Sequence, residues 1–136
     1  KNGQTALMAS ARSSETLFNL LLSKGADLTI KANDGTTALT QACIGVLRNK
    51  VPLAGVQKIL DKGADVNEAA KSGRTEGYTC LMMAARNNQL DLAKLLVNNG
   101  ANVNNKTKDG KSALALSLEE KNAEMTAYLK TQGAKE

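Results

Sequence analysis

The 136-residue chain contains no histidine, and this absence removes most of the ways in which a protein carries out chemistry. Ser-His-Asp triads, Cys-His pairs and histidine metal ligands are all impossible without it. Two cysteines are too few for a four-ligand structural zinc site without help from carboxylates. No phosphate-binding loop of the GxGxxG or GxxxxGK[ST] type occurs either. We therefore expect no enzyme activity, no cofactor and no metal site within these residues.

Acidic clusters do not change this expectation. Asp61 and Asp65 form one cluster, and Glu119, Glu120 and Glu124 form another. Both lie on predicted helix ends or exposed helix faces, where carboxylates are normally solvated. We interpret them as surface.

Aromatic side chains are almost as scarce as histidine. Phe18, Tyr78 and Tyr128 are the only ones, and tryptophan is absent. Three scattered rings cannot form the ladder on which single-stranded nucleic acids stack their bases. A hydrophobic content of 42% with so few large rings favours thin, closely packed layers of leucine and alanine. The length favours one domain.

Long apolar runs are also missing. None approaches the roughly 18 residues of a membrane span, and no signal peptide is recognisable. The chain begins at Lys1 and not at methionine, so we expect it to be a trimmed or processed piece. An intracellular location is favoured, and an exported or periplasmic one stays open because the N-terminus is expected to be trimmed.

Charge of one sign is in modest excess, with 18 basic and 13 acidic residues and a formal net charge of +5. The charges are interspersed, and no block of one sign occurs. This pattern is typical of an ordinary basic surface. The alternative is a surface for an acidic partner or for nucleic acid.

What the chain does have is an internal repeat. A Gly-x-Thr/Ser-x-Leu motif occurs four times, starting at Gly3, Gly35, Gly77 and Gly110. A Gly-Ala pair also occurs four times at matching places, starting at Gly25, Gly63, Gly100 and Gly133. The turn glycines are 32, 42 and 33 residues apart.

Each repeat predicts two short helices, as residues 77–107 illustrate. Thr79 is a predicted N-cap, because its hydroxyl can accept from the N–H groups that open a helix. The Asn87-Asn88 pair breaks that helix, since asparagine tolerates the left-handed conformation. Gly100 is placed to end the second helix. Leu96 is predicted to lie in the core between repeats. Helices this short need neighbours to be stable.

A period near 33 with turn, helix, helix and a Gly-Ala exit is typical of ankyrin repeats, and the chain resembles an ankyrin-repeat protein over essentially its whole length. The resemblance implies an all-α solenoid of helix-turn-helix units with β-hairpin fingers. We expect a single domain over residues 1–136, with repeats at about 1–32, 33–69, 77–107 and 108–136. The proline and histidine of the family motif are missing, which removes the family's Thr–His hydrogen bonds.

Two insertions interrupt the pattern, near residues 44–50 and 69–76. The first either prolongs a helix or forms a loop, and Pro52 suits the first turn of the helix that follows. Insertions in solenoids often map to a binding face, although a neutral insertion is the open alternative. We expect residues 44–50 and 71–76 to be the most mobile, with only Ile44, Val46 and Leu47 as apolar anchors.

The ends of the chain differ from its middle. Repeat one is a residue short near Ser13 and Ser14, which predicts a tighter turn between its helices. It shows no clear polar cap, so we expect that another element once preceded it. Repeat four carries Ser117 and Lys130 where repeat three is apolar, which predicts a C-terminal cap with a polar face.

The two cysteines, Cys43 and Cys80, lie inside predicted helix motifs and not in a spaced framework. Cysteine behaves as a small hydrophobe, so we predict buried free thiols. A disulfide stays open at this point, because the two residues belong to adjacent repeats.

The resemblance also implies a binding face, made by the fingers and the exposed ends of the first helices. Carried over residue by residue, the predicted partner-binding positions are Tyr78, Arg86, Ile44, Asn87, Glu76, Lys108, Lys111, Thr36 and Asp34. Beside them lie Asn33, Asp109, Arg12, Ser13, Glu119 and Glu120. The alternative for each position is a plain surface residue.

Tyr78 and Arg86 are the residue types enriched at binding hot spots. The tyrosine ring is expected to project from its finger, away from the helices, and Arg86 to face the concave side. Three finger lysines, Lys106, Lys108 and Lys111, predict a partner that presents acidic groups around an apolar contact.

The functional hypothesis is thus a non-catalytic ankyrin module that binds a protein partner and is itself a monomer. No small-molecule substrate is expected. Two alternatives stay open. The module could bind nucleic acid or an anionic surface, which a steep salt dependence would reveal. It could also be the regulatory domain of a larger enzyme.

Overall fold

A computed structural model describes residues 5–71 and 76–135. In these residues the chain forms eight helices, and we found no membrane-spanning candidate among them. The helices are α1 (Ala6–Ser13), α2 (Glu15–Ser23), α3 (Ala38–Leu47), α4 (Leu53–Asp61), α5 (Cys80–Arg86), α6 (Leu90–Asn98), α7 (Ala113–Glu119) and α8 (Ala123–Thr131). Each consecutive pair falls inside one of the four repeat ranges given above.

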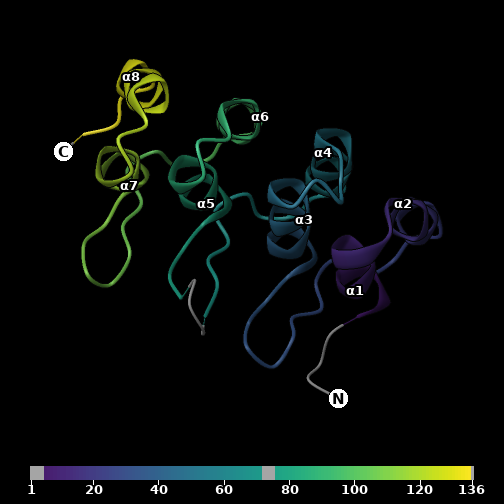
Figure 1. Cartoon of the computed structure of the whole chain (residues 1–136). Coiled ribbons are helices and arrows are strands. Elements are labelled where there is room, and N and C mark those ends of the chain that lie inside the picture. Colours follow the sequence, from purple (N-terminus) through teal and green to yellow (C-terminus); the bar gives the residue numbers. More distant parts are fainter. Residues whose placement is uncertain (1–4, 72–75, 136) are drawn as a thin grey trace.

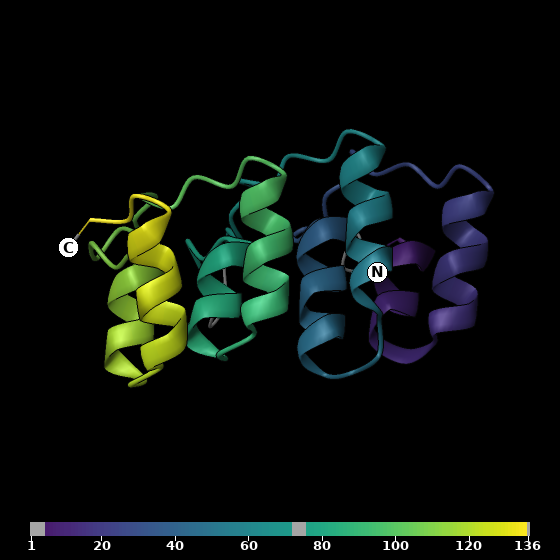
Figure 2. The same ribbon diagram turned by 90° about the horizontal axis from the view of Figure 1, so that it is seen from above.

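The helices stack in two layers. The first helices of the pairs, α1, α3, α5 and α7, form one layer, and the second helices form the other (Figures 1 and 2). The loops between pairs extend from the side of the first helices, so that this layer lies between the second helices and the loops (Figure 1). This arrangement is an all-α repeat solenoid, as the sequence predicted.

Side-chain caps begin the first helix of every pair. The hydroxyls of Thr5, Thr37, Thr79 and Ser112 each accept a hydrogen bond from the backbone N–H three residues further on, at 3.2–3.3 Å. Such a bond satisfies one of the donors that a helix start leaves free. The predicted N-cap at Thr79 is confirmed.

The predicted helix ends are confirmed as well. Asn88 has a φ of 54°, in the left-handed region, directly after the C-cap of α5. Gly100 has a φ of 90° directly after the C-cap of α6. A side chain at Gly100 would be strained at this φ, which is why glycine is favoured at the position.

The turns between the two helices of a pair differ in length, as the missing residue in repeat one and the insertion in repeat two predicted. Ser14 alone joins α1 to α2: its N–H donates to the Ser10 carbonyl at 2.9 Å, and its hydroxyl accepts from Leu17 N at 3.3 Å. The first insertion prolongs α3, which ends at Leu47. Pro52 is the N-cap of α4, one position before the predicted first turn.

Small residues allow the pairs to approach closely. Ala11, Cys43 and Ala85 occupy matching positions in α1, α3 and α5, and all three are fully buried. Leu96 is 0% exposed, which confirms its predicted place in the core. Both cysteines are buried and free, so the open question of a disulfide is answered in favour of thiols. Burial and the neighbouring Cys80 thiol raise the pKa of Cys43 well above its usual value.

Amide side chains bridge neighbouring repeats. Gln57 of α4 and Asn99 after α6 exchange two hydrogen bonds, at 2.9 and 3.0 Å. In the loops that leave the second helices, the Asn67 side chain accepts from the Asn102 N–H at 2.7 Å, and Asn104 accepts from the Lys135 N–H at 2.9 Å.

At the periphery one expectation is not confirmed and another is wrong. The β-hairpin fingers are not confirmed: in the described residues the fingers show isolated antiparallel bridges, Ala69 with Thr79 and Lys106 with Ser112, and no named strand. Ser117 does not contribute to a polar end face, because it is buried and bonded to the Thr126 hydroxyl at 2.8 Å. The end face instead exposes Leu118, at 43%. Residues 72–75 of the second insertion lie outside the described residues.

Candidate interaction face

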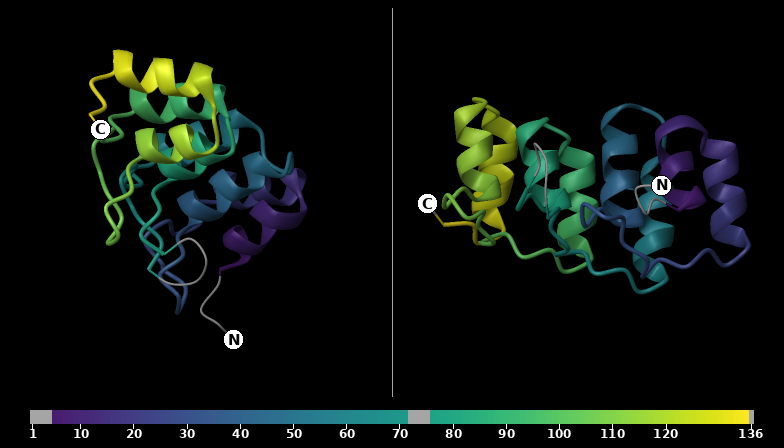
Figure 3. Two further views of the ribbon diagram at one scale, coloured as in Figure 1. Left: turned by 60° about the vertical axis from the view of Figure 1, so that its left-hand side comes forward. Right: turned by 90° about the horizontal axis from the view of Figure 1, so that it is seen from below.

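A groove of about 440 Å³ runs between the ends of α3 and α5, on the face of the first helices. Figure 3 shows this layer from two further directions, with the loops on one side of it. The groove is lined by Ile44, Leu47, Arg48, Tyr78, Met83, Arg86 and Asn87. Four of these seven are predicted partner-binding residues: Ile44, Tyr78, Arg86 and Asn87.

Apolar side chains make most of the groove. Met83 of α5 is 3% exposed and is the most buried of them. Ile44 and Leu47 of α3 are half-buried. Tyr78 is also half-buried and packs against the core, so its ring does not project away from the helices as expected. The ring is held in the groove by this packing.

The first insertion builds one side of the groove. Leu47 is the last residue of the prolonged α3, and Arg48 is its C-cap. The chain then turns back, because the Gly45 carbonyl accepts from the N–H groups of Lys50 at 2.8 Å and of Val51 at 3.3 Å. Val51 is buried and anchors the insertion, an anchor that sequence reasoning missed.

Ion pairs neutralise much of the charge around the groove. Arg86 lies 3.6 Å from a carboxylate oxygen of Glu120, between Nε and Oε1. On the fingers, Lys111 pairs with Glu119 at 3.1 Å and Lys108 with Glu76 at 3.4 Å. The hydrogen bond to Glu119 and its negative charge raise the pKa of Lys111.

These pairs bear on the predicted acidic partner. Lys108 and Lys111 were expected to offer free positive charge, but each already has a carboxylate beside it. Exposed pairs of this kind contribute little stability. They nevertheless remove much of the attraction that these two fingers would exert on an anion.

The other predicted residues lie partly outside the groove. Asn87 lines it and donates from Nδ2 to the Met83 carbonyl at 2.8 Å. Asp34 and Thr36 are on the finger before α3, where the Asp34 carboxylate accepts from the Thr36 N–H at 2.9 Å. A hydrogen bond from the Thr36 side chain, together with this backbone bond, lowers the pKa of Asp34. Neither residue lines the groove.

Leu47, Arg48 and Met83 line the groove but were not predicted. The signal for the first two was the insertion itself, because extra residues at the end of a first helix must extend over the concave side. Met83 follows the repeated leucine of its motif by two residues, a position that predicts an ordinary core residue. Only the stacking of α3 beside α5 shows that the groove reaches it.

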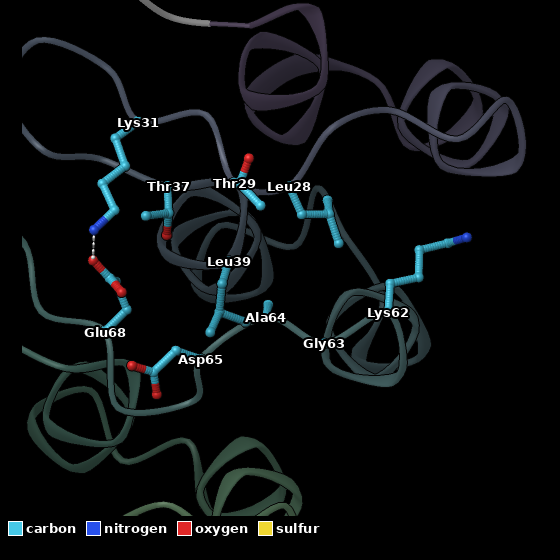
Figure 4. Close-up of a pocket in the computed structure, with 10 residues that line it drawn as sticks. All are labelled: Leu28, Thr29, Lys31, Thr37, Leu39, Lys62, Gly63, Ala64, Asp65 and Glu68. Carbon is cyan, nitrogen blue, oxygen red and sulfur yellow. Dashed lines mark ion pairs between the residues drawn. The ribbon is translucent and has the colours of Figure 1, made fainter.

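A second hollow, of about 260 Å³, lies between the loops that leave α2 and α4 (Figure 4). Lys31 and Glu68 approach from the two loops and pair at 2.7 Å, while Lys62 points away from the hollow (Figure 4). Thr29 stands where the later repeats have a bridging asparagine, and its hydroxyl donates to Asp27 at 2.6 Å. The hollow thus lies where the first repeat lacks the asparagine hydrogen bond that joins neighbouring loops in the later repeats.

No group of three or more metal-binding side chains occurs in residues 5–71 and 76–135. The two thiols are buried. Fold and face together define a helical repeat protein with an open, mainly apolar groove on its concave side.

The chain belongs to the ankyrin-repeat family. Residues 46–135 match the family described as ankyrin repeats (3 copies), and residues 2–33 match the single ankyrin repeat. Ankyrin repeats are generally protein–protein interaction modules and typically non-catalytic.

Two curated mouse (Mus musculus) proteins are similar to the chain. One is the B-cell lymphoma 3 protein homolog, 35% identical over 120 residues, which are 84% of this chain and 25% of that protein. The other is ankyrin repeat and SOCS box protein 16, 33% identical over 97 residues, which are 69% of this chain and 20% of that protein. The chain thus spans about a quarter or less of the length of these relatives.

Proposed function

We propose that the chain is a non-catalytic module that binds a protein partner on the first-helix face of α3, α5 and α7 and on the adjoining fingers. Tyr78 and Arg86 lie near the centre of this contact. The partner buries the groove between α3 and α5, and the polar finger residues form the rim.

One observation carries the proposal: predicted binding residues from separate elements line the same groove. Ile44 comes from α3, Tyr78 from the finger before α5, and Arg86 and Asn87 from the end of α5. Partly exposed apolar side chains around a buried floor are the usual centre of a protein interface, with polar residues around them. A tyrosine and an arginine at such a centre are typical hot spots.

The test requires a partner, recovered by pull-down from the native organism and identified by mass spectrometry. Titration calorimetry then compares the wild type with Tyr78→Ala and Arg86→Ala. We expect Tyr78→Ala to lose about 2 kcal/mol of binding free energy or more, roughly a thirtyfold weaker affinity.

Tyr128→Ala is the matched control, because Tyr128 is the other half-buried tyrosine. It lies on α8 in the second layer, beneath the Lys94 ammonium at 5.9 Å. Circular dichroism should show that all variants stay folded. Wild-type affinity in both Tyr78→Ala and Arg86→Ala would move the interface off this face.

A further inference from the structure

The charges that line the groove between α3 and α5 are all of one sign. Arg48 enters from the end of α3 and Arg86 from the end of α5, and no Asp or Glu is among the residues that line it. Arg86 has one carboxylate contact, with Glu120 at 3.6 Å. Arg48 is exposed and has no ion pair within the described residues.

Two guanidinium groups on opposite sides of an apolar groove favour a ligand that carries both a negative charge and an apolar group. Like charges cannot pair with each other, and only one of these two has a carboxylate from its own chain. A guanidinium binds a carboxylate through directed, charge-assisted hydrogen bonds, which are stronger than neutral ones. The apolar floor meanwhile favours a hydrocarbon side chain over a polar one.

We propose that the groove accepts a peptide segment of the partner in which an apolar side chain stands next to an Asp or Glu. The apolar side chain lies over Met83, between Ile44 and Tyr78. The neighbouring carboxylate pairs with Arg48. This inference rests on the proposed function, because it places the partner on the same face and specifies the chemistry of its contact.

The insertion supplies the two groups through which the groove would select such a segment. Without the extra residues α3 would end before Leu47 and Arg48, so one apolar wall and the unpaired cation would both be missing. The finger lysines do not substitute for Arg48, because Lys108 and Lys111 are already paired with carboxylates and Lys106 does not line the groove. The acidic character expected of the partner therefore concentrates at one position beside the groove.

The experiment uses phage-displayed random peptides about a dozen residues long as the probe. They are selected in parallel on the immobilised 136-residue chain and on its Arg48→Glu variant. Lys24→Glu is the matched control, because Lys24 is also an exposed basic residue at a helix C-cap, but it belongs to α2 in the second layer and does not line the groove. Arg48 is exposed, so its replacement should leave the fold intact.

We expect the wild type to select peptides in which an apolar residue adjoins Asp or Glu. Arg48→Glu should weaken these peptides about tenfold, the effect of losing one charge-assisted contact. The peptides selected on Arg48→Glu should instead carry Lys or Arg beside the apolar residue. Lys24→Glu should select the same peptides as the wild type.

Three results would overturn the inference, and they differ in their meaning for the proposed function. Selected peptides that lack a carboxylate but lose binding in Tyr78→Ala would refute only the acidic neighbour. Selected peptides whose affinity for Tyr78→Ala and for Arg86→Ala equals their affinity for the wild type would place recognition elsewhere. This result would refute both the proposed face and the inference. An equal effect of Arg48→Glu and Lys24→Glu would show that the peptides respond to the overall charge of the chain and not to Arg48, and would refute the proposed contact.

Discussion

Gly45 of α3 offers a test of how the insertion is held, because an alanine there should destabilise the protein although alanine is the better helix former. A Cβ atom at this position would lie 2.4 Å from the Ala11 carbonyl oxygen and 2.6 Å from Cγ2 of Val51. Neither approach is tolerable. The oxygen belongs to the backbone of α1, so it cannot move unless α1 and α3 separate.

Two opposing terms set the size of the effect. Replacing glycine by alanine inside a helix stabilises by about 0.5–1 kcal/mol, because the unfolded chain loses freedom. Overpacking a well-filled core costs about 1–3 kcal/mol. The contact with a backbone atom favours the upper part of that range. We therefore expect Gly45→Ala to lower the free energy of unfolding by about 1–2 kcal/mol net.

Urea unfolding followed by circular dichroism measures this difference, and Ala127→Gly serves as the matched control. Ala127 is exposed in the middle of α8, so its replacement reports the helix-propensity term alone, a loss of about 1 kcal/mol. A Gly45→Ala variant more stable than the wild type would refute the tight contact between α1 and α3. The proposed support for the groove wall would then be wrong.

Four further predictions can be tested on the same chain. Leu96→Ala should cost about 2–5 kcal/mol in urea unfolding, and an unchanged midpoint would contradict the stacking. Cys43 and Cys80 should resist alkylation until the protein unfolds, because both thiols are buried and out of reach of the reagent; mass spectrometry that finds both labelled in native protein would contradict this. Thr29→Asn should stabilise by about 0.5–1.5 kcal/mol by supplying the missing bridge, and a lower unfolding midpoint would show that the gap is filled otherwise. Hydrogen bonds lower the pKa of Asp34, so its stabilising contribution is complete above the unfolded value of 3.8 and is lost as the pH falls through the lower folded pKa; the stability difference between wild type and Asp34→Asn should therefore shrink in that acidic range, and a difference independent of pH would contradict it.

The sequence predicted the fold well because the signals for it are local. A hydroxyl at Thr79, left-handed residues at Asn88 and Gly100, and small side chains at Cys43 and Ala85 each act within one or two turns of the chain. Repetition of these signals at a fixed period then leaves stacking as the way to bury the leucines. No long-range information was needed for these steps.

The groove needed information that the sequence does not display locally. Whether the first insertion formed a loop or prolonged α3 depends on Val51, which packs against Gly45 of the same unit, and on the close approach of Ala11 from the preceding helix. Leu47 and Arg48 line the groove only because the insertion prolongs α3 and does not form a loop. The inward packing of Tyr78 depends in the same way on how its finger lies against the helices.

Charge was the least predictable property of the face. Counting lysines on the fingers indicated a basic surface, yet Lys111 reaches Glu119, eight residues further along the chain, and Lys108 reaches Glu76 on the preceding finger. Both pairs depend on where the fingers lie relative to the helices and to each other. A count of formal charges cannot separate cations that are already paired from those that are available.

The two neighbouring junctions of the first-helix layer show why the available cation lies where it does. Between α5 and α7, Arg86 faces Glu120, and Asn122 donates to the Ala85 carbonyl at 2.9 Å, so the ends of these helices are bridged by the chain itself. Between α3 and α5 the charged side chains that line the groove are Arg48 and Arg86, and within the described residues no ion pair joins these two helices. The insertion thus adds a cation at this junction, where a carboxylate would be needed to pair with it. A partner that supplies this carboxylate would complete a bridge that the solenoid makes for itself one repeat further on.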